Sequence, residues 1–515
     1  MGFSDLNKPK SFEGASAVTI EGPASSFGSV SVNTIRAQAQ GDFVYGIQDQ
    51  IFVTSSFFGG SVNSVSGMCE VASGTDPSGS ATVQLRRGLK YRPGQGSLMR
   101  ATALYDTPSS QNAQLIGVGN AECGYFIGYF GETFGILHSQ TGQREIRKLE
   151  ITTPVTTNEI VTLTLNGETI QVPVTGAASV TQTAYQIAQA DYSQVGGASG
   201  GFLVDVVSSS VFFLSARSTP NATGTYSVAG ASVAGTFSQI KAGVSQTNTL
   251  IPSSSFNIDR LDGSGPSGMT FDPSRGNVFQ IDFQYLGFGN ANFAIEDPET
   301  GFLSLFHRIK NANSRTTPVL KNPNLSCLAT STNILGGTTS KTLKTVSMAT
   351  FIEGEVVKLD PKYAKSFSFA SVTEADFTPL ALLKANRVFN GESCFGEFDI
   401  LRLAASNVTT ATGKTLTVGF FINAEIGGDV NYEYVNEQNS IVSYAALIPD
   451  GTGKNTITNL ADLTPFYEIV LSPGQSNTEN LDTLEFLFSL ANPLLIAIKG
   501  NGVDGDVSIN WFEQQ

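Results

Sequence analysis

The chain has 515 residues, too many for one ordinary domain, so two to four folding units are expected. Only 14% of the residues are charged, against a typical ~25%, and 53 are glycine, which predicts many short β elements with uncharged polar surfaces. The formal net charge of −14 disfavours nucleic acid or an anionic membrane as a partner, because both attract clustered Lys and Arg.

Targeting signals and cysteines give further limits. No stretch approaches the ~20 apolar residues of a membrane span, and the start, MGFSDLNKPK, has no apolar core of a signal peptide. We therefore expect a soluble protein made in the cytoplasm, without membrane insertion. The four scattered cysteines are predicted to be free, buried, apolar residues rather than a disulfide pair: Cys69, Cys123, Cys327 and Cys394.

Residues 30–149 show short alternating runs interrupted by glycine, which is typical of an antiparallel sandwich. The run GYFIGYFGETFGIL carries five aromatic side chains, and for four of them two roles stay open. They either alternate between the core and a contact with another subunit, or they form a platform on which sugars stack. These four side chains are Tyr125, Tyr129, Phe130 and Phe134.

Five basic residues lie close together in this otherwise acidic chain. They form either a solvated strand face or a docking patch for an acidic neighbouring subunit. The five are Arg86, Arg87, Lys90, Arg92 and Arg100.

Residues 151–245 predict a small inserted ββαββ module. EIVTLTLNGETIQVPVT indicates a hairpin with its turn at Asn166-Gly167. The following SVTQTAYQIAQADYS predicts a helix capped by Ser179 or Thr181, and GFLVDVV and SVFFLSA predict two more strands. The module is expected to follow an edge strand of the first sandwich that ends near Leu149.

The stretch 277–309 contains a Gly-x-Gly after a strand, which raises the question of a phosphate-binding loop. Asn292 stands where the third glycine of a dinucleotide loop is needed, and no helix follows to present its amides to an anion. Gly287 and Gly289 are therefore predicted to be turn residues in a three-strand meander.

A third unit begins near residue 361, after a linker that ends in LDPKYAK. Strands are predicted in SCFGEFDILRLAAS, KTLTVGFFINAEI, VNYEYVNEQNSIVSYAAL and PFYEIVLSPG. The end of the chain is predicted to be a hairpin that carries the only tryptophan, Trp511. Its loop GNGVDGD lacks the spacing and the terminal Glu of a calcium loop, so a turn is favoured.

Few residues are suited to catalysis. Only two histidines exist, His138 and His307, and each is predicted to be structural at a sheet surface. The chain has no CxxC pair and no G-x-S-x-G elbow, and nothing selects a carboxylate pair from its 44 acidic residues. We expect no enzyme activity, no catalytic residue, no metal and no cofactor.

Three stretches resemble the virion structural proteins of marine tailed phages and large algal DNA viruses. The first is LKYRPGQGSLMRATALYDTP followed by IGVGNAECGYFIGYFGETFGIL, and the second is NVFQIDFQYLGFGNANFAIEDPETGFLSLFHRIKNAN. The third is the C-terminal unit, from TPLALLKANRVFNGES to VSINWFEQQ. The ending WFEQQ departs from the basic endings of such terminal modules.

The resemblance implies a mainly β fold with several antiparallel sandwiches. A lectin-like jelly roll would comprise residues 1–150 and 246–358, the inserted α/β module 151–245, and a C-terminal β-sandwich 365–515. The implied function is a fibre, spike, tail or capsid-surface component of the virion. Its implied partners are other virion proteins, further copies of the chain (a trimer is favoured), and a host surface glycan or receptor. The alternative is a carbohydrate-binding adhesin or a polysaccharide depolymerase.

Overall fold

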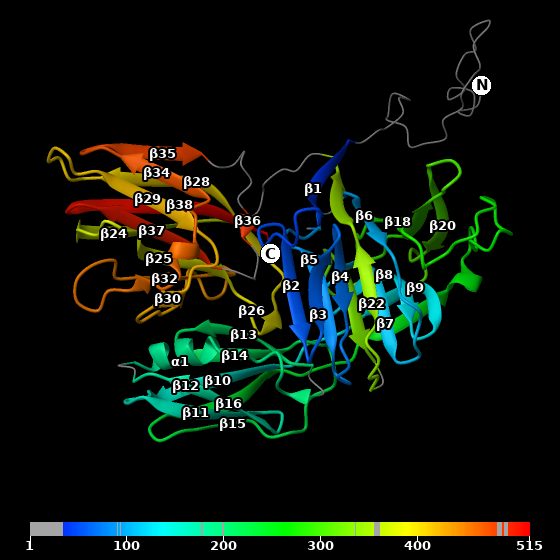
Figure 1. The fold of residues 1–515 in the computed structure, drawn as a ribbon, viewed down its shortest axis with the longest axis horizontal. Helices are drawn as coiled ribbons and strands as arrows, with labels where there is room; N and C mark the ends of the chain where they lie inside the picture. The colour runs from blue at the N-terminus through cyan, green and yellow to red at the C-terminus, as the bar shows by residue number, and fades with distance from the viewer. Residues whose placement is uncertain are drawn as a thin grey trace, which may run out of the picture.

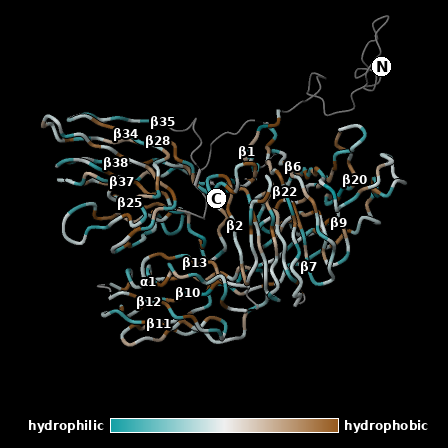
Figure 2. Tube along the Cα trace, in the orientation of Figure 1, coloured by the Kyte–Doolittle hydropathy of each residue, from teal (hydrophilic) through white to brown (hydrophobic). Residues whose placement is uncertain are grey.

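The computed structural model describes residues 34–89, 91–92, 94–176, 179–197, 200–334, 336–354, 361–480, 487–488 and 493–514. Within them the protein is mainly antiparallel β, as predicted, and forms three groups of sheets that lie against one another (Figure 1). Hydrophobic residues run along many of the strands, whereas many connecting loops are hydrophilic (Figure 2).

The first group, called the N-terminal sandwich, contains two large sheets and one small sheet. The six-stranded sheet has the order β1 (Ile35–Asp42), β23 (Ser347–Glu353), β6 (Ser97–Ala103), β18 (Asn277–Phe283), β19 (Ala291–Glu296), β20 (Leu303–Ile309). The seven-stranded sheet has the order β17 (Thr247–Pro252), β9 (Thr133–Gln140), β8 (Gly124–Phe130), β7 (Asn112–Gly119), β21 (Ser326–Asn333), β5 (Ser80–Leu85), β2 (Phe52–Phe57). The small sheet has the order β22 (Thr342–Thr345), β4 (Met68–Ala72), β3 (Ser61–Val65).

The alternation in the sequence explains how the two large sheets pack. In β18, Phe279 and Ile281 are fully buried while Gln280 and Asp282 face outward, as the pattern predicts. One hydrophobic cluster fills the space between the sheets and includes Met99 of β6 and Ile116 of β7. The core of this sandwich is therefore built from strand faces that can be recognised in the sequence.

The Gly-x-Gly stretch is confirmed as the turn of a hairpin. β18 pairs with β19 in antiparallel register, and the turn contains Leu286 and Gly287, with φ of 38° and 78°. Gly289 has no room for a side chain, since an added Cβ would lie 1.4 Å from the carbonyl oxygen of Gln284. The glycines thus shape the turn between two antiparallel strands.

The second group, called the inserted module, lies between two paired strands of the N-terminal sandwich. Its four-stranded sheet has the order β13 (Phe202–Val207), β14 (Ser210–Ser215), β10 (Ile146–Thr153), β16 (Ala234–Lys241). Its three-stranded sheet has the order β12 (Glu168–Val174), β11 (Glu159–Leu165), β15 (Ser227–Ala229). Because β17 pairs along its whole length with β9, and Gln140 at the end of β9 lies opposite Thr247 at the start of β17, the chain leaves and re-enters the sandwich at neighbouring points.

The predicted helix is confirmed as α1 (Val180–Ala188), and Ser179 is its N-cap, with its hydroxyl accepting from the Gln182 amide. The edge-strand prediction was wrong, because the strand containing Leu149 is β10, which pairs with β14 and β16 of the module. Ile146 and Leu149 are fully buried against the module, so this pairing covers their apolar side chains. The strands β15 and β16 were not predicted.

The third group, called the C-terminal sandwich, has two main sheets. The first has the order β24 (Lys362–Val372), β38 (Val503–Gln514), β28 (Glu397–Asn407), β35 (Ser476–Asn480), with β36 (Leu487–Phe488) also on β28. The second has the order β31 (Glu433–Tyr434), β32 (Val442–Ala446), β25 (Thr378–Ala385), β37 (Leu494–Gly500), β29 (Leu416–Phe421), β34 (Tyr467–Leu471). Two short ribbons join β26 (Val388–Phe389) with β27 (Glu392–Ser393), and β30 (Ile426–Gly427) with β33 (Thr456–Ile457).

The predicted C-terminal hairpin was wrong. β37 pairs with β25 and β29 in one sheet, whereas β38 pairs with β24 and β28 in the opposing sheet. The short connection with Gly502 at a φ of 65° therefore crosses from one layer to the other. Ile496 and Ile509 then enter the same core from opposite sides, which a hairpin within one sheet does not allow.

The central strands of the six-stranded sheet of the C-terminal sandwich are buried on both faces. Along β37, Leu494, Ile496 and Ile498 face the sandwich core, while Leu495 and Ala497 face the inserted module. Both sets are fully buried. The uninterrupted apolar run is thus explained by a strand that is covered on both sides.

Candidate functional site

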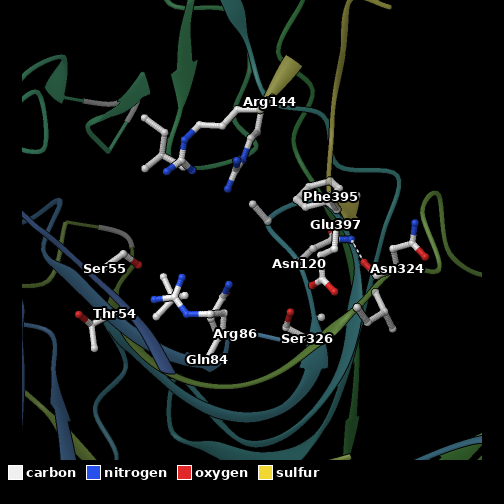
Figure 3. A pocket seen from close by; sticks show the side chains of 17 residues that line it. Thr54, Ser55, Gln84, Arg86, Asn120, Arg144, Asn324, Ser326, Phe395 and Glu397 are labelled. Atoms are coloured by element: carbon white, nitrogen blue, oxygen red, sulfur yellow. Dashed lines mark hydrogen bonds between the residues drawn. The ribbon is translucent and has the colours of Figure 1, made fainter. Parts of the chain in front are cut away.

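An arginine-lined pocket lies where the three groups of sheets meet, and we call it the junction pocket. Its volume is about 190 Å³. Arg86 and Gln84 come from the N-terminal sandwich, Arg144 from the start of the module, and Arg387 and Glu397 from the C-terminal sandwich. Figure 3 shows Arg86, Arg144 and Glu397 approaching it from different sides.

Arg86 follows β5 and is held by the backbone of a neighbouring loop. Its Nε donates to the carbonyl oxygen of Asp49 at 2.7 Å, and its Nη2 also donates to that oxygen and to Phe52 O at 3.5 Å. Burial lowers the pKa of Arg86, while the charges of Asp49 and Glu397 oppose this shift. The side chain is therefore fixed at the pocket by neutral acceptors.

Arg144 lies just before β10, and its guanidinium carbon is 5.7 Å from the ring centroid of Phe395. Burial lowers the pKa of Arg144 to about 10, Glu122 opposes this, and the like charge of Arg387 adds to it. Arg144 is still a cation at neutral pH. Its Nε is buried and has no hydrogen-bond acceptor within the described part of the chain.

Arg387 and Glu397 come from the two ends of the short β26–β27 ribbon region. The backbone amide of Arg387 donates to Asp205 Oδ2 at 2.7 Å, and burial lowers the pKa of its guanidinium, opposed by Asp205. Glu397 Oε1 accepts from the amide of Gly88 at 2.9 Å. Backbone amides near the pocket are thus bonded to carboxylates of a neighbouring unit, which joins all three units.

The structure separates the five basic residues of the predicted docking patch. Arg86 lines the junction pocket, whereas the Nη1 of Arg87 donates to Gln38 O at 3.1 Å, towards β1. Arg100 is on the other large sheet, where its Nε donates to Gln280 Oε1 at 2.8 Å. Arg92 lies half-buried in the loop before β6, and Lys90 lies outside the described residues.

The four aromatic residues do not form an exposed platform. Tyr125 is 1% exposed and stacks on His138 at 4.6 Å, while Tyr129 and Phe134 make edge contacts with the buried Tyr105. Phe130 packs half-buried on the opposite face of the same sheet. Their strand-like alternation thus places three of them in the sandwich core.

The two histidines are structural but buried, which corrects the predicted position at a sheet surface. His138 Nδ1 accepts from Gln140 Nε2 at 2.8 Å, so its Nε2 carries the proton and donates to Val319 O at 3.0 Å. Burial lowers the pKa of His138 to about 4. His307 Nδ1 accepts from the Asn257 amide at 3.1 Å, and burial lowers its pKa too.

Three of the four free cysteines are buried as predicted, and Cys394 is half-buried. Burial raises the pKa of the Cys69 thiol to about 12 and that of Cys123 to about 11, so neither is a thiolate nucleophile at neutral pH. Among the described residues, no group of three or more His, Cys, Asp or Glu side chains is placed to hold a metal ion.

The junction pocket was not predicted as a site. Arg86 was singled out for its basic neighbours, but Arg144 and Arg387 stand alone among polar residues, far apart in the sequence. No local pattern joins them, because the pocket exists only after the three units pack together.

The fold places the chain in the class of mainly antiparallel β proteins with stacked sandwiches. No helix in the described part of the chain is long and apolar enough to cross a membrane. No protein-family model matches the chain, and no curated protein matches it.

Solved structures match it at low similarity. The carbohydrate recognition domain of Emp47p is 7% identical, with a TM-score of 0.25 over 62% of this chain and 97% of that one. Winged bean acidic lectin is 9% identical, with a TM-score of 0.21 over 62% and 99%. A triple jelly-roll turret protein of an archaeal virus is 8% identical, with a TM-score of 0.14 over 96% and 98%. Values this low assign no function.

Proposed function

We propose that this chain is a structural component of a virion, on a fibre, spike, tail or capsid surface, that acts by assembling with copies of itself and with other virion proteins. The observation that carries the proposal is the joining of its three units. The Gly88 amide of the N-terminal sandwich donates to Glu397 of the C-terminal sandwich, and the inserted module shares a core with the C-terminal sandwich. Leu149 and Phe213 of the inserted module share one buried cluster with Leu382 and Leu495 of the C-terminal sandwich. A body locked in this way transmits load and presents fixed surfaces to neighbours.

The burial of the reactive side chains supports the same proposal. Both histidines and three of the four thiols are engaged in cores. The family-like stretches noted above form β6 to β9, β18 to β20 and the C-terminal sandwich, so the resemblance covers framework strands. We therefore propose that the chain has no enzyme activity.

A small apolar tip provides a contact for a second copy of the chain. Val44 and Tyr45, 62% and 87% exposed, follow β1, and Val65 is 45% exposed at the end of β3. The loop after β1 touches the end of β3, since Ser64 Oγ donates to Phe43 O at 3.3 Å. Exposed apolar groups gathered at one tip gain free energy when another subunit covers them.

Size-exclusion chromatography with light scattering tests this proposal. We expect an oligomer, with a trimer favoured, that dissociates in the double variant Val44→Ser/Tyr45→Ser. Phe302→Ser is the matched control, because Phe302 is 76% exposed in a different loop. A wild-type chain that stays a dilute monomer, and that binds no other particle component in pull-down, contradicts the proposal.

The alternative function, glycan binding or polysaccharide cleavage, has a separate test. The aromatic side chains first considered for sugar stacking are largely in the core, so a sugar would have to use other groups. A glycan array with a reducing-sugar assay on host polysaccharide distinguishes the two functions. Oligosaccharide release shows an enzyme, and binding without release shows an adhesin.

A further inference from the structure

The junction pocket contains half-buried guanidinium groups that form no side-chain ion pair with another described residue. The Nε of Arg144 lacks an acceptor, and the Arg387 guanidinium forms no hydrogen bond or ion pair with another described residue. Withdrawing an unpaired cation from water is unfavourable unless an opposite charge compensates it. The like charge of Arg387 also lowers the pKa of Arg144, which increases the need for a negative charge in the pocket.

The carboxylates nearest to these arginines are already engaged elsewhere. Glu122 Oε2 is 3.1 Å from Lys321 Nζ, and its Oε1 accepts from the backbone amide of Arg144. Asp205 pairs with Lys384 and accepts from the backbone amide of Arg387. Glu122 and Asp205 therefore hold the backbone amides of the two arginines. Each carboxylate also forms an ion pair with a lysine.

The charges that line the pocket do not cancel. Three guanidinium groups, those of Arg86, Arg144 and Arg387, face one carboxylate, Glu397. Arg86 donates to backbone carbonyls, which satisfy its N–H groups but carry no charge, and the nearby Asp49 and Glu397 carboxylates favour its charged form. The lining thus carries an excess of two positive charges.

We propose that the junction pocket binds a small divalent oxoanion of the size of phosphate or sulfate. The open Nε edge of a guanidinium presents two parallel N–H groups, which match two oxygens of such an anion. The volume of about 190 Å³ is sufficient for one such ion with a few waters, and a divalent charge balances the excess. This site is separate from the proposed assembly function, and an ion held there links all three units.

Thermal unfolding in chloride, phosphate or sulfate at matched ionic strength tests the site, with isothermal titration of inorganic phosphate as the direct measurement. In the wild type, phosphate and sulfate should raise Tm saturably, by roughly 2–4 °C, relative to chloride. Arg144→Gln and Arg387→Gln should abolish the response. Arg100→Gln is the matched control, since it removes the same charge from an exposed side chain on another sheet and should respond like the wild type.

A variant that is expected to strengthen anion binding keeps the test decisive if an arginine variant fails to fold. Glu397→Gln still offers an oxygen to the Gly88 amide but removes the competing carboxylate, so phosphate should bind at least several-fold more tightly. An equal response to glucose 6-phosphate would show that the anionic group can belong to a larger molecule, and a response only to free phosphate would show an inorganic ion. A wild type with no saturable response, or a response unchanged in all arginine and Glu397 variants, overturns the proposal.

Discussion

Lys384 of the C-terminal sandwich and Asp205 of the inserted module form an ion pair that is almost completely withdrawn from solvent. Their side chains are 12% and 4% exposed. Lys384 Nζ also donates to Val206 O at 2.7 Å and lies 4.4 Å from the ring centroid of Tyr432. Burial lowers the pKa of Lys384, and Asp205 opposes this shift. The pair joins two units that are separate in the sequence.

Asp205→Ala should destabilise the protein strongly, because it leaves the Lys384 cation buried without its partner. The expected loss is about 3–5 kcal/mol in the free energy of unfolding, measured by urea denaturation. The control is Lys454→Ala, which breaks the solvent-exposed pair with Glu374 and should change stability little. Equal effects of the two substitutions would contradict the role of the buried pair.

The stability should fall as the pH decreases from about 6.5 to about 4, in part because of His138. In the folded protein the pKa of His138 is about 4, so its imidazole stays neutral down to that pH. In the unfolded chain a histidine has a pKa near 6.5. The unfolded state therefore binds a proton first as the pH falls, which costs about 3 kcal/mol of stability by pH 4 and nothing above pH 7.

Chemical denaturation at a series of pH values measures this dependence. His138→Gln should flatten the curve between pH 4 and pH 6.5 while leaving a smaller slope from His307, whose pKa is also lowered. An unchanged curve in this variant would show that other groups cause the pH dependence.

Trp511 should report the unfolding of the C-terminal sandwich alone, since it is the only tryptophan and is fully buried. Its Nε1 donates to Glu513 Oε1 at 2.9 Å, and the same carboxylate accepts from Ser440 Oγ and from the Ile441 amide at 2.8 Å. Glu513→Gln removes the charge from this network and should cost roughly 1–3 kcal/mol. Fluorescence should show an earlier transition, and Glu468→Gln on the edge strand β34 serves as the exposed control.

Gly289→Ala should disrupt the β18–β19 hairpin, because the added Cβ meets the Gln284 carbonyl. Gly287→Ala should cost only about 1–2 kcal/mol, since its φ of 78° is strained for alanine but the space around it is open. Gly276→Ala is the matched control, with open space and no positive φ, and should be within about 0.5 kcal/mol of the wild type. Thermal unfolding gives the ranking, and a Gly289 variant as stable as the control would contradict the predicted clash.

Thiol titration should label one cysteine in the native protein and four after unfolding. Cys394 is half-buried, whereas Cys69, Cys123 and Cys327 are buried and have thiol pKa values raised by burial. A Cys394→Ser variant should therefore lose nearly all native reactivity. Rapid labelling of more than one thiol in the native state would show that the sandwich cores open readily.

Much of the local structure could be predicted because its causes are local. Strict alternation in β18 indicated which side chains enter the core, Asn166 and Gly167 with φ of 52° and 83° made the predicted turn, and Ser179 capped the predicted helix. The aromatic residues of β8 show the limit of this reasoning. Alternation indicated that Tyr125 and Phe130 point to opposite faces, but not which face a second sheet would cover.

The sequence by itself determined the strands, their turns and the mainly antiparallel class, because hydrophobic alternation and backbone preferences act over a few residues. Only the tertiary structure decided the partners of β10 and the crossing between β37 and β38, since pairing depends on which apolar faces meet across the chain. It alone also placed Arg144 beside Arg387, because the charges of three packed units converge only after their cores have formed.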